Sequence, residues 1–344
     1  MHRRSNATVS PDPGTNVVPI GARRPRAGAF RPALPESPRP AAATPGEGAS
    51  EGFLIACARL LQAGGAALTW ENVARVWGAR YFSRHSEDVD DFGFDPKFNA
   101  SVLPFFEFLY TMWWRVEVAG IENVPAEGPG VIVANHSGVL PWDGLMVNLA
   151  VRHEHPAGRQ CRMLALDMFA LLPFFAPLLA RMGAVRANPE NGERLLRRGE
   201  LVGVFPEGVK GVGKPYKERY KLARFGRGGF VRLALRAGAP IVPCAIVGAE
   251  EVHPKIGSMD WVGRPFGLPY FPITPTFPAL GPLGVVPLPS KWSIDFAEPV
   301  EVEEYGPQAA DDPILVNRLS EQVRGTVQRM IDSRLARRRS VWFG

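Results

Sequence analysis

The sequence has few residues of the kinds that cross-link or bind metal. Its 344 residues include only three cysteines, Cys57, Cys161 and Cys244, which are widely spaced and odd in number. Such spacing excludes a disulfide framework and does not fit a zinc pattern. His153 and His155 are two positions apart and face different ways on a helix, so we expect no metal site. A reducing, intracellular compartment is the simplest interpretation.

The sequence also lacks an uninterrupted apolar run of about twenty residues, the length of a membrane-spanning helix. Three shorter or broken apolar segments are present, at residues 52–70, 102–114 and 163–182. Each is either a core helix or a segment lying in a membrane interface, where aromatic residues and Arg suit the headgroup layer. Three such segments in one basic chain favour an interfacial face.

Residues 1–50 are poor in aromatic residues and show no apolar periodicity. They are rich in Pro, Ala, Gly and Arg, so they cannot bury enough surface to offset the entropy of ordering. The basic start lacks the apolar core of a signal peptide. We therefore expect a disordered tail over residues 1–50, apolar and membrane-interfacial helices over 51–113, and the main domain over 114–344.

An excess of positive charge points to anionic partners. The net charge is +6, from 40 Lys and Arg against 34 Asp and Glu. Nucleic acid, anionic lipid headgroups and a phosphorylated substrate would each satisfy this charge. No nucleic-acid-binding motif or basic–aromatic platform is present, so we expect no nucleic-acid partner.

From residue 114 onward, short β-rich apolar runs alternate with helical segments. We expect strands at residues 115–119, 131–134, 163–166, 201–205, 241–247 and 292–296, of which 163–166 also fits the start of a helix. We expect helices at residues 143–151, 230–236 and 312–338. This alternation predicts an α/β fold with a mixed, largely parallel sheet flanked by helices.

The segment VANHSGVLPWD places a histidine directly after a predicted strand. In open α/β sheets, chemistry gathers beyond the carboxyl ends of the strands. His136 lies at such an exit, and Asp143 begins the next helix. An imidazole there can take a proton from a hydroxyl while a carboxylate on its other nitrogen holds the tautomer. The alternative is a histidine in a turn and an ordinary helix N-cap.

The segment VFPEGVKG repeats this arrangement at a second strand exit. Pro206 fixes the turn, Glu207 projects from it, and Gly208 and Gly211 allow a ligand to approach closely. Six basic residues follow with only one acid, Glu218, among them: Lys210, Lys214, Lys217, Arg219, Lys221 and Arg224. The run is either a solvated face or a phosphate-binding surface.

Four blocks together resemble the lysophospholipid and glycerolipid acyltransferase family, over about residues 100–300. In chain order, the blocks are Asn135-His136 with Asp143, Gly183-Ala-Val-Arg186, Phe205-Pro-Glu-Gly208 and Ile241-Val-Pro243. The first and third blocks are the more specific ones and fit 1-acylglycerol-3-phosphate acyltransferase-like proteins. The Pro-Trp-Asp ending of the first block is similar to the monoacylglycerol-acyltransferase-like branch. The loop from His136 to Asp143 is two residues longer than the family's usual one.

The resemblance implies a role for each matching residue. His136 is the general base, oriented by Asp143, and Arg186 grips the phosphate or other polar head of the acceptor. Glu207 and Gly208 position the glycerol portion of the acceptor.

Two further residues complete the implied site. Lys210, at a position where the family commonly has Arg, supplies a point charge without Arg's bidentate fork. Pro243 shapes the site wall.

The implied reaction is direct acyl transfer from an acyl thioester, acyl-CoA or acyl-ACP, to a lipid hydroxyl, with no further cofactor. No predicted strand is followed by a Gly-x-Ser-x-Gly elbow that could form an acyl-enzyme, and the match at residues 48–52 lies at the border of the predicted tail. We expect lysophosphatidate as the acceptor, and a neutral acceptor (mono- or diacylglycerol, or a long-chain alcohol) is the alternative. A lipid hydrolase and a non-catalytic lipid-binding protein are the rival classes. The resemblance also implies a domain beside a membrane. Together with the basic charge and the apolar segments, we expect a peripheral or monotopic protein at the cytoplasmic face of a membrane with anionic lipid.

Overall fold

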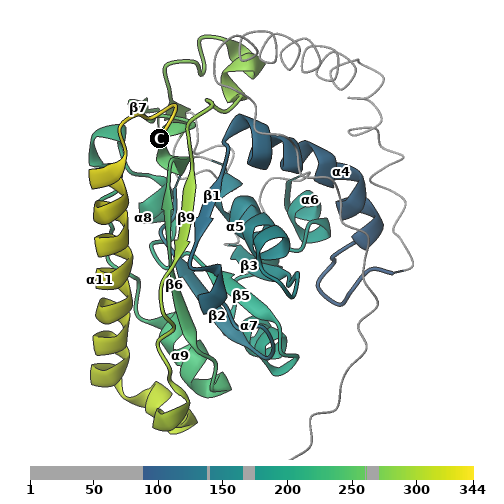
Figure 1. Ribbon diagram of the computed structural model, residues 1–344, viewed down its shortest axis with the longest axis vertical. Coiled ribbons are helices and arrows are strands. Elements are labelled where there is room, and N and C mark those ends of the chain that lie inside the picture. The colour runs from purple at the N-terminus through teal and green to yellow at the C-terminus, as the bar shows by residue number, and fades with distance from the viewer. Residues whose placement is uncertain (1–87, 138–139, 166–174, 260, 262–270) are drawn as a thin grey trace, which may run out of the picture. The chain divides into compact units, whose positions relative to one another are not determined.

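The computed structural model describes residues 88–137, 140–165, 175–259, 261 and 271–344 (Figure 1). The predicted tail, the apolar segment at residues 52–70 and the middle of the segment at 163–182 lie outside the described residues. The predicted division of the chain into three parts therefore stays a prediction. The described residues belong to one compact unit.

Short strands and helices alternate along this unit, as the sequence predicts. The strands are β1 (Glu117–Ala119), β2 (Gly130–Ala134), β3 (Cys161–Ala165), β4 (Val185–Arg186), β5 (Leu201–Val204), β6 (Ile241–Val247), β7 (Gly257–Ser258), β8 (Pro272–Ile273) and β9 (Ser293–Phe296). The α-helices are α4 (Pro96–Phe108), α5 (Trp142–Glu154), α6 (Phe175–Arg181), α7 (Pro189–Arg197), α8 (Val209–Val212), α9 (Gly229–Ala237) and α11 (Pro313–Arg337). A π-helical turn, η1 (Leu109–Trp113), extends α4, and short 3₁₀ turns lie at η2 (Ile121–Asn123), η4 (Tyr216–Glu218), η5 (Ala249–Glu251), η7 (Gly281–Val285), η8 (Glu303–Tyr305) and η9 (Pro307–Asp311).

Seven strands form the main sheet in the order β1-β9-β6-β2-β5-β3-β4. The five strands from β6 to β4 are parallel to one another, whereas β9 runs antiparallel to β6 and parallel to β1. This confirms the predicted mixed, largely parallel sheet. Val133 of β2 pairs with Val204 of β5 on one side and with Pro243 of β6 on the other. The loops that leave β2 and β5 therefore emerge side by side.

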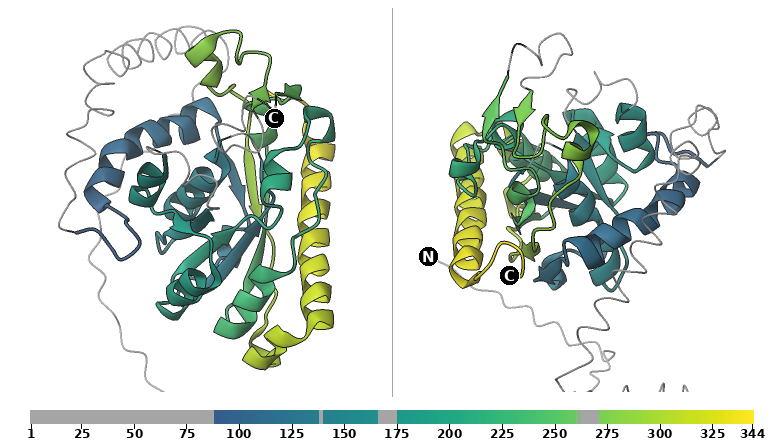
Figure 2. Two further views of the ribbon diagram at one scale, coloured as in Figure 1. Left: turned by 180° about the vertical axis from the view of Figure 1, so that it is seen from behind. Right: turned by 90° about the horizontal axis from the view of Figure 1, so that it is seen from above.

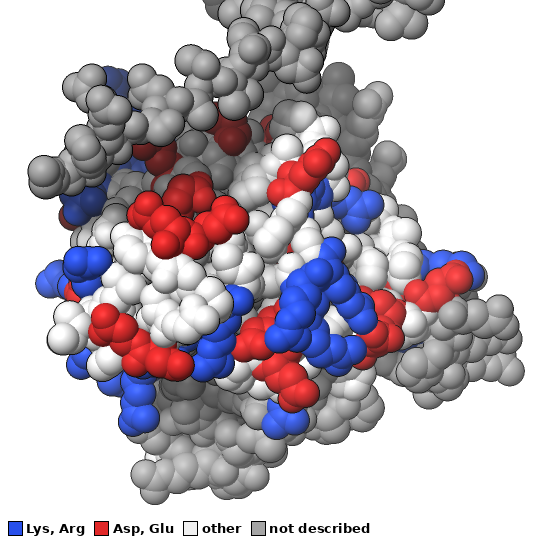
Figure 3. Space-filling model, turned by 90° about the horizontal axis from the view of Figure 1, so that it is seen from below, with Lys and Arg blue, Asp and Glu red and all other residues white. Residues whose placement is uncertain are grey.

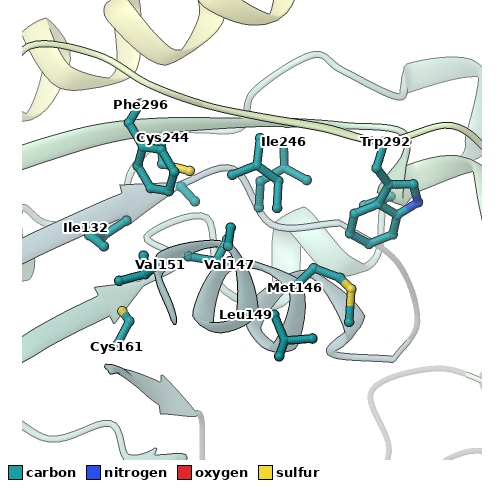
Figure 4. Packing of buried hydrophobic residues seen from close by; sticks show 14 of the residues in the cluster. Ile132, Met146, Val147, Leu149, Val151, Cys161, Cys244, Ile246, Trp292 and Phe296 are labelled. Carbon is teal, nitrogen blue, oxygen red and sulfur yellow. The ribbon is translucent and has the colours of Figure 1, made fainter. Parts of the chain in front are cut away.

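Helices cover both faces of this sheet (Figure 1, Figure 2). Helices α4, α5 and α6 lie on one face, and α7, α9 and α11 lie on the other. Every residue of β2 is buried, as expected for a strand covered on both faces. Figure 4 shows the core on the α5 side, where Met146 and Val147 face Ile246 and Trp292.

The elements that carry the first block match their prediction closely. Helix α5 begins at Trp142, one residue before the predicted start, and ends at Glu154. Asp143 lies in its first turn, where the partial positive charge of a helix N-terminus stabilises a carboxylate. The edge strand β4 and helix α7 were not predicted, because two-residue strands and short polar helices carry little periodic signal.

The apolar length of the helices and the distribution of surface charge both bear on the predicted membrane partner. In the part of the chain that the structure describes, no helix is long and apolar enough to cross a membrane. In the view from below, Lys and Arg side chains are interspersed with Asp and Glu (Figure 3). The net positive charge is therefore not concentrated on that face.

Candidate active site

The histidine and aspartate of the first block form a buried pair. Nδ1 of His136 lies 2.7 Å from Oδ2 of Asp143, and the two side chains are 8% and 0% exposed. Because a carboxylate only accepts, Nδ1 carries the proton in this contact and Nε2 is the nitrogen left to act as a base. The structure thus brings together the two residues that the sequence predicted as base and orienter.

Backbone groups fix the Asp143 carboxylate in place. Oδ2 also accepts a hydrogen bond from the Ser137 amide at 2.8 Å, and Oδ1 accepts one from the Gly144 amide at 2.8 Å. One carboxylate therefore holds both the imidazole and the backbone that follows it. The longer loop does not prevent this, because Asp143 returns to the loop on the first turn of α5.

The neighbours of His136 hold its backbone and its ring. The Asn135 side chain donates to the Ile246 carbonyl at 2.9 Å and accepts from the Ile246 amide at 2.7 Å, so it continues the pairing of β2 with β6. The Phe205 ring stacks on the imidazole with centroids 4.4 Å apart and planes at 15°. These contacts restrict both the position and the rotation of the imidazole.

Glu207 holds the loop of His136 from the neighbouring strand. Its Oε1 accepts from the His136 amide at 3.1 Å, and its Oε2 accepts from the Ala223 amide at 2.7 Å. Lys214 Nζ lies 3.4 Å from the same Oε2, and the Glu207 side chain is 0% exposed. Both oxygens are used within the protein, so Glu207 joins three segments at the site. Its predicted contact with an acceptor stays a prediction.

The two glycines after Glu207 have different functions. Gly208 has φ of 56°, a left-handed conformation that suits glycine. At Gly211, a Cβ atom would lie 2.8 Å from Cβ of Glu207 and 3.0 Å from Cβ of His136. The absent side chain of Gly211 thus lets α8 pack directly on His136, a role that the sequence did not predict.

An apolar cavity of ≈ 160 Å³ extends from His136 toward Cys161 of β3. Its described lining includes eight large apolar side chains: Leu145, Met163, Leu164, Leu179, Met182, Val204, Phe205 and Val212. Asn148 also lines it, and its Oδ1 accepts from the Cys161 amide at 3.0 Å. The predicted base therefore adjoins a space that suits a hydrocarbon chain.

The other predicted residues lie around this centre and outside the described lining of the cavity. Arg186 is exposed at the end of β4, between the lining residues Ala184 and Ala187. Lys210 is exposed on α8, next to Gly211. Pro243 is buried within β6. Their predicted contacts with the acceptor and the site wall stay predictions.

Sequence reasoning did not predict the buried pairing of two charged residues beside the site, and named Lys214 only as part of the basic run. Lys214 is only 9% exposed and pairs with Glu207 and with Glu250, which is 3.2 Å away. Burial raises the pKa of Glu250 to about 7, against the opposing effect of Lys214. Burial also lowers the pKa of His253 to about 4, and its Nε2 accepts from Nε1 of Trp142 at 3.4 Å. Nothing in the basic run distinguishes Lys214 from its exposed neighbours.

Comparison with known proteins identifies the family. Residues 115–247 match the family described as Acyltransferase. An uncharacterized protein of Mycobacterium tuberculosis is 52% identical over 257 residues, which are 74% of this chain and 72% of that protein. The chain belongs to the acyltransferase family. An uncharacterized protein of Mycobacterium leprae is 51% identical over the same length, 74% of this chain and 70% of that protein.

Two further similarities concern proteins with described activities. A human protein, the DGAT1/2-independent enzyme synthesizing storage lipids, is 28% identical to this acyltransferase over 64% of this chain and 62% of its own length. The crystal structure of the 1-acyl-sn-glycerophosphate acyltransferase from Thermotoga maritima is 20% identical, with a TM-score of 0.44 over 84% of this chain and 94% of that chain.

The substrates that family membership implies are an acyl donor and a lipid acceptor. No group of three or more metal-ligating side chains is found among the residues that the structure describes.

Proposed function

We propose that the protein transfers an acyl group from an acyl thioester to a hydroxyl group of a glycerolipid, with lysophosphatidate as the acceptor. The observation that carries this proposal is the His136–Asp143 pair beside the apolar cavity. The acyl chain would lie in the cavity, which places its thioester carbonyl near the imidazole.

The chemistry needs one base and no covalent intermediate. Nε2 of His136 takes the proton of the acceptor hydroxyl as that oxygen attacks the thioester carbonyl. The new C–O ester bond forms, the C–S bond breaks, and the proton passes from the imidazolium to the departing thiolate. Asp143 stabilises the imidazolium between these two transfers. General-base catalysis of this kind is worth roughly 10²–10⁴-fold, and the remainder comes from positioning and from donors to the oxyanion.

A phosphorylated acceptor is favoured by two cations near the carboxyl edge of the sheet. Arg186 ends β4 and Lys210 adjoins Gly211, and both side chains are exposed. A phosphate held there would stay hydrated while the acyl chain is buried. Each charge-assisted hydrogen bond would contribute about 1.5–3 kcal/mol.

A neutral acceptor is the second candidate. The described lining of the cavity includes no Lys or Arg. The human relative is named for the synthesis of storage lipids. Monoacylglycerol, diacylglycerol or a long-chain alcohol would need no cation at the site.

One assay tests the activity and the acceptor. Purified full-length protein in detergent is incubated with labelled acyl-CoA or acyl-ACP and with lysophosphatidate, other lysophospholipids, mono- and diacylglycerol or long-chain alcohols. Labelled ester formed only with lysophosphatidate supports the first candidate. Arg186→Ala should then raise KM for lysophosphatidate about tenfold or more, as expected from a lost charge-assisted bond. No ester with any acceptor, or hydrolysis alone, would contradict acyl transfer.

A further inference from the structure

A buried ion network adjoins the loop that carries the catalytic histidine. Lys214 Nζ lies between Oε2 of Glu207 at 3.4 Å and Oε1 of Glu250 at 3.2 Å. None of the three side chains is more than 9% exposed. Lysine is rarely buried to this extent unless it is paired. Here two buried carboxylates, those of Glu207 and Glu250, pair with it.

Glu207 connects this network to the base. Its Oε1 accepts from the His136 amide and its Oε2 accepts from the Ala223 amide. Because Lys214 faces Oε2, a shift of the lysine acts on the carboxylate that holds His136. Lys214 is therefore connected to His136 through two contacts, its own ion pair with Glu207 and the hydrogen bond from the His136 amide to Glu207.

Glu250 makes the lysine necessary for the charge balance. It accepts from the Tyr220 amide at 3.1 Å as well as from Lys214. Two buried carboxylates near one another repel, and the charge of Lys214 opposes this repulsion. Without the lysine, Glu207 and Glu250 would both be left without their buried cation.

Other charged groups pack around this network. Glu251, next to Glu250, lies 2.7 Å from Arg338 and 3.9 Å from Arg219. His253 and Lys255 line the same small polar pocket as Lys214 and Glu250. Lys255 donates to the Gly213 carbonyl at 2.8 Å.

We propose that Lys214 is a positioning residue for acyl transfer: it holds the Glu207 carboxylate against the backbone amide of His136 and so fixes the imidazole beside the cavity. Its effect on the rate rests on the proposed function. Its effect on the His136 amide does not, because that hydrogen bond is present without substrate.

Three variants of the full-length protein test this role. Lys214→Met removes the charge and keeps the length of the side chain, and Lys214→Arg keeps the charge. Lys217→Met is the matched control, since Lys217 is an exposed lysine of the same segment. Hydrogen exchange of the His136 amide is measured without substrate, relative to the amide of Val133 in β2, and kcat and KM are measured for each variant.

We expect Lys214→Met to speed exchange of the His136 amide at least about tenfold while Val133 is unchanged, as for loss of one buried hydrogen bond. We expect kcat to fall about tenfold or more with KM within about twofold, because the imidazole is displaced rather than the substrate site. Lys214→Arg should retain more of both properties than Lys214→Met, and Lys217→Met should match the wild type.

Equal exchange ratios in Lys214→Met and wild type would overturn the proposal, and so would faster exchange with an unchanged kcat. If the wild type transfers no acyl group, the proposed function is contradicted. Faster exchange of the His136 amide in Lys214→Met would still support the contact of Lys214 with Glu207. If Lys214→Met does not fold, Glu250→Gln replaces it. Glu250→Gln removes one of the two carboxylates that pair with Lys214 and leaves its contact with Glu207. The His136 amide should therefore exchange no faster than in wild type. Faster exchange in that variant would overturn the proposal.

Discussion

The carboxylate of Asp143 lies 2.7 Å from Nδ1 of His136, although six residues separate them in the sequence. The contact forms because His136 follows β2 and Asp143 occupies the first turn of α5, which packs on the same sheet. The Ser137 amide binds the same carboxylate oxygen and closes the loop around it. The pair is therefore determined by two adjacent elements rather than by the length of the loop.

If this pair supplies the base, His136→Ala should lower kcat at least about 10²-fold, and the protein should remain folded with a modest change in its free energy of unfolding. Asp143→Asn should also lower kcat, because it removes the charge that stabilises the imidazolium, and its loss can be smaller. His153→Ala is the matched control, since His153 is 38% exposed and lies at the far end of α5. Steady-state kinetics and thermal unfolding check each variant. A near-normal rate in His136→Ala would exclude the assignment.

The close packing at Gly211 gives a second prediction. In Gly211→Ala, the new Cβ would lie 2.8 Å from Cβ of Glu207 and 3.0 Å from Cβ of His136, so α8, Glu207 or His136 must shift. We expect a loss of kcat of about tenfold or more and a loss of stability of about 1–3 kcal/mol.

Gly229→Ala is the control for this change, because no atom lies within 4 Å of the added Cβ. It should be neutral or stabilise the protein by about 0.4–1 kcal/mol. Denaturant unfolding and initial rates are measured for both variants. An active, stable Gly211→Ala protein would show that α8 can move away from His136 without cost.

The sequence predicted the elements around the site well because their signals are local. The all-apolar run Ile241–Val247 forms a buried strand, parallel to β2 and antiparallel to β9, and its predicted bounds are those observed. The Asn-His block and the Phe-Pro-Glu-Gly block both follow such strands. Because neighbouring parallel strands end at the same edge, their meeting also followed from the pattern.

The role of single polar residues could not be predicted in the same way. Lys214 and Lys217 lie in one basic run, yet the first is buried between two carboxylates and the second is exposed. Only the fold brings Glu250, from the turn after β6, to Lys214. Gly211 resembles a ligand-binding glycine in the sequence, and only its distance to His136 reveals its packing role.

The apolar cavity predicts that side-chain size controls the acyl chain. Met163→Ala enlarges the cavity and should shift preference toward longer chains, and Ala184→Leu should shift it toward shorter ones. One buried CH₂ is worth about 0.8 kcal/mol, so two carbons change relative kcat/KM up to about tenfold. A series of acyl donors of increasing length measures this. Met112→Ala, at an exposed position outside the described lining, should leave the preference unchanged. Unaltered preference in both cavity variants would place the acyl chain elsewhere.

The buried Glu250 predicts a pH dependence of stability. Its pKa is raised from 4.5 to about 7, so between these values the folded state binds a proton that the unfolded state has lost. The free energy of unfolding should therefore fall as pH rises from about 4.5 to 7, by an amount on the order of 1–3 kcal/mol.

His253 contributes the opposite slope. Its pKa is lowered from 6.5 to about 4, so its contribution to stability is lost as pH falls through that range. The test is therefore the difference between wild type and Glu250→Gln in denaturant unfolding from pH 5 to 8. The variant should gain stability relative to wild type as pH rises toward 7. A constant difference across this range would mean that Glu250 does not titrate there.

Exposed apolar side chains between η5 and β9 predict a contact with lipid. Residues 271–290 contain no charged residue. Six exposed large apolar side chains lie between η5 and β9 among the described residues: Ile256, Trp261, Leu280, Leu283, Val285 and Val286. We expect the protein to sediment with anionic vesicles, and less strongly at higher salt because part of the attraction is screened.

Leu283→Glu tests whether this surface takes part. Leu283 is 72% exposed, and burying a leucine in lipid is worth about 1.5–3 kcal/mol, so its loss should weaken vesicle binding about tenfold or more. Ile314→Glu is the matched control, because Ile314 is 80% exposed at the start of α11, away from this segment in the sequence. Both variants change the net charge of the protein by the same amount, so Ile314→Glu measures how far that change alone weakens binding. Equal weakening in the two variants would mean that charge, and not contact through Leu283, controls binding. Unchanged binding of Leu283→Glu would place the lipid contact on another part of the chain.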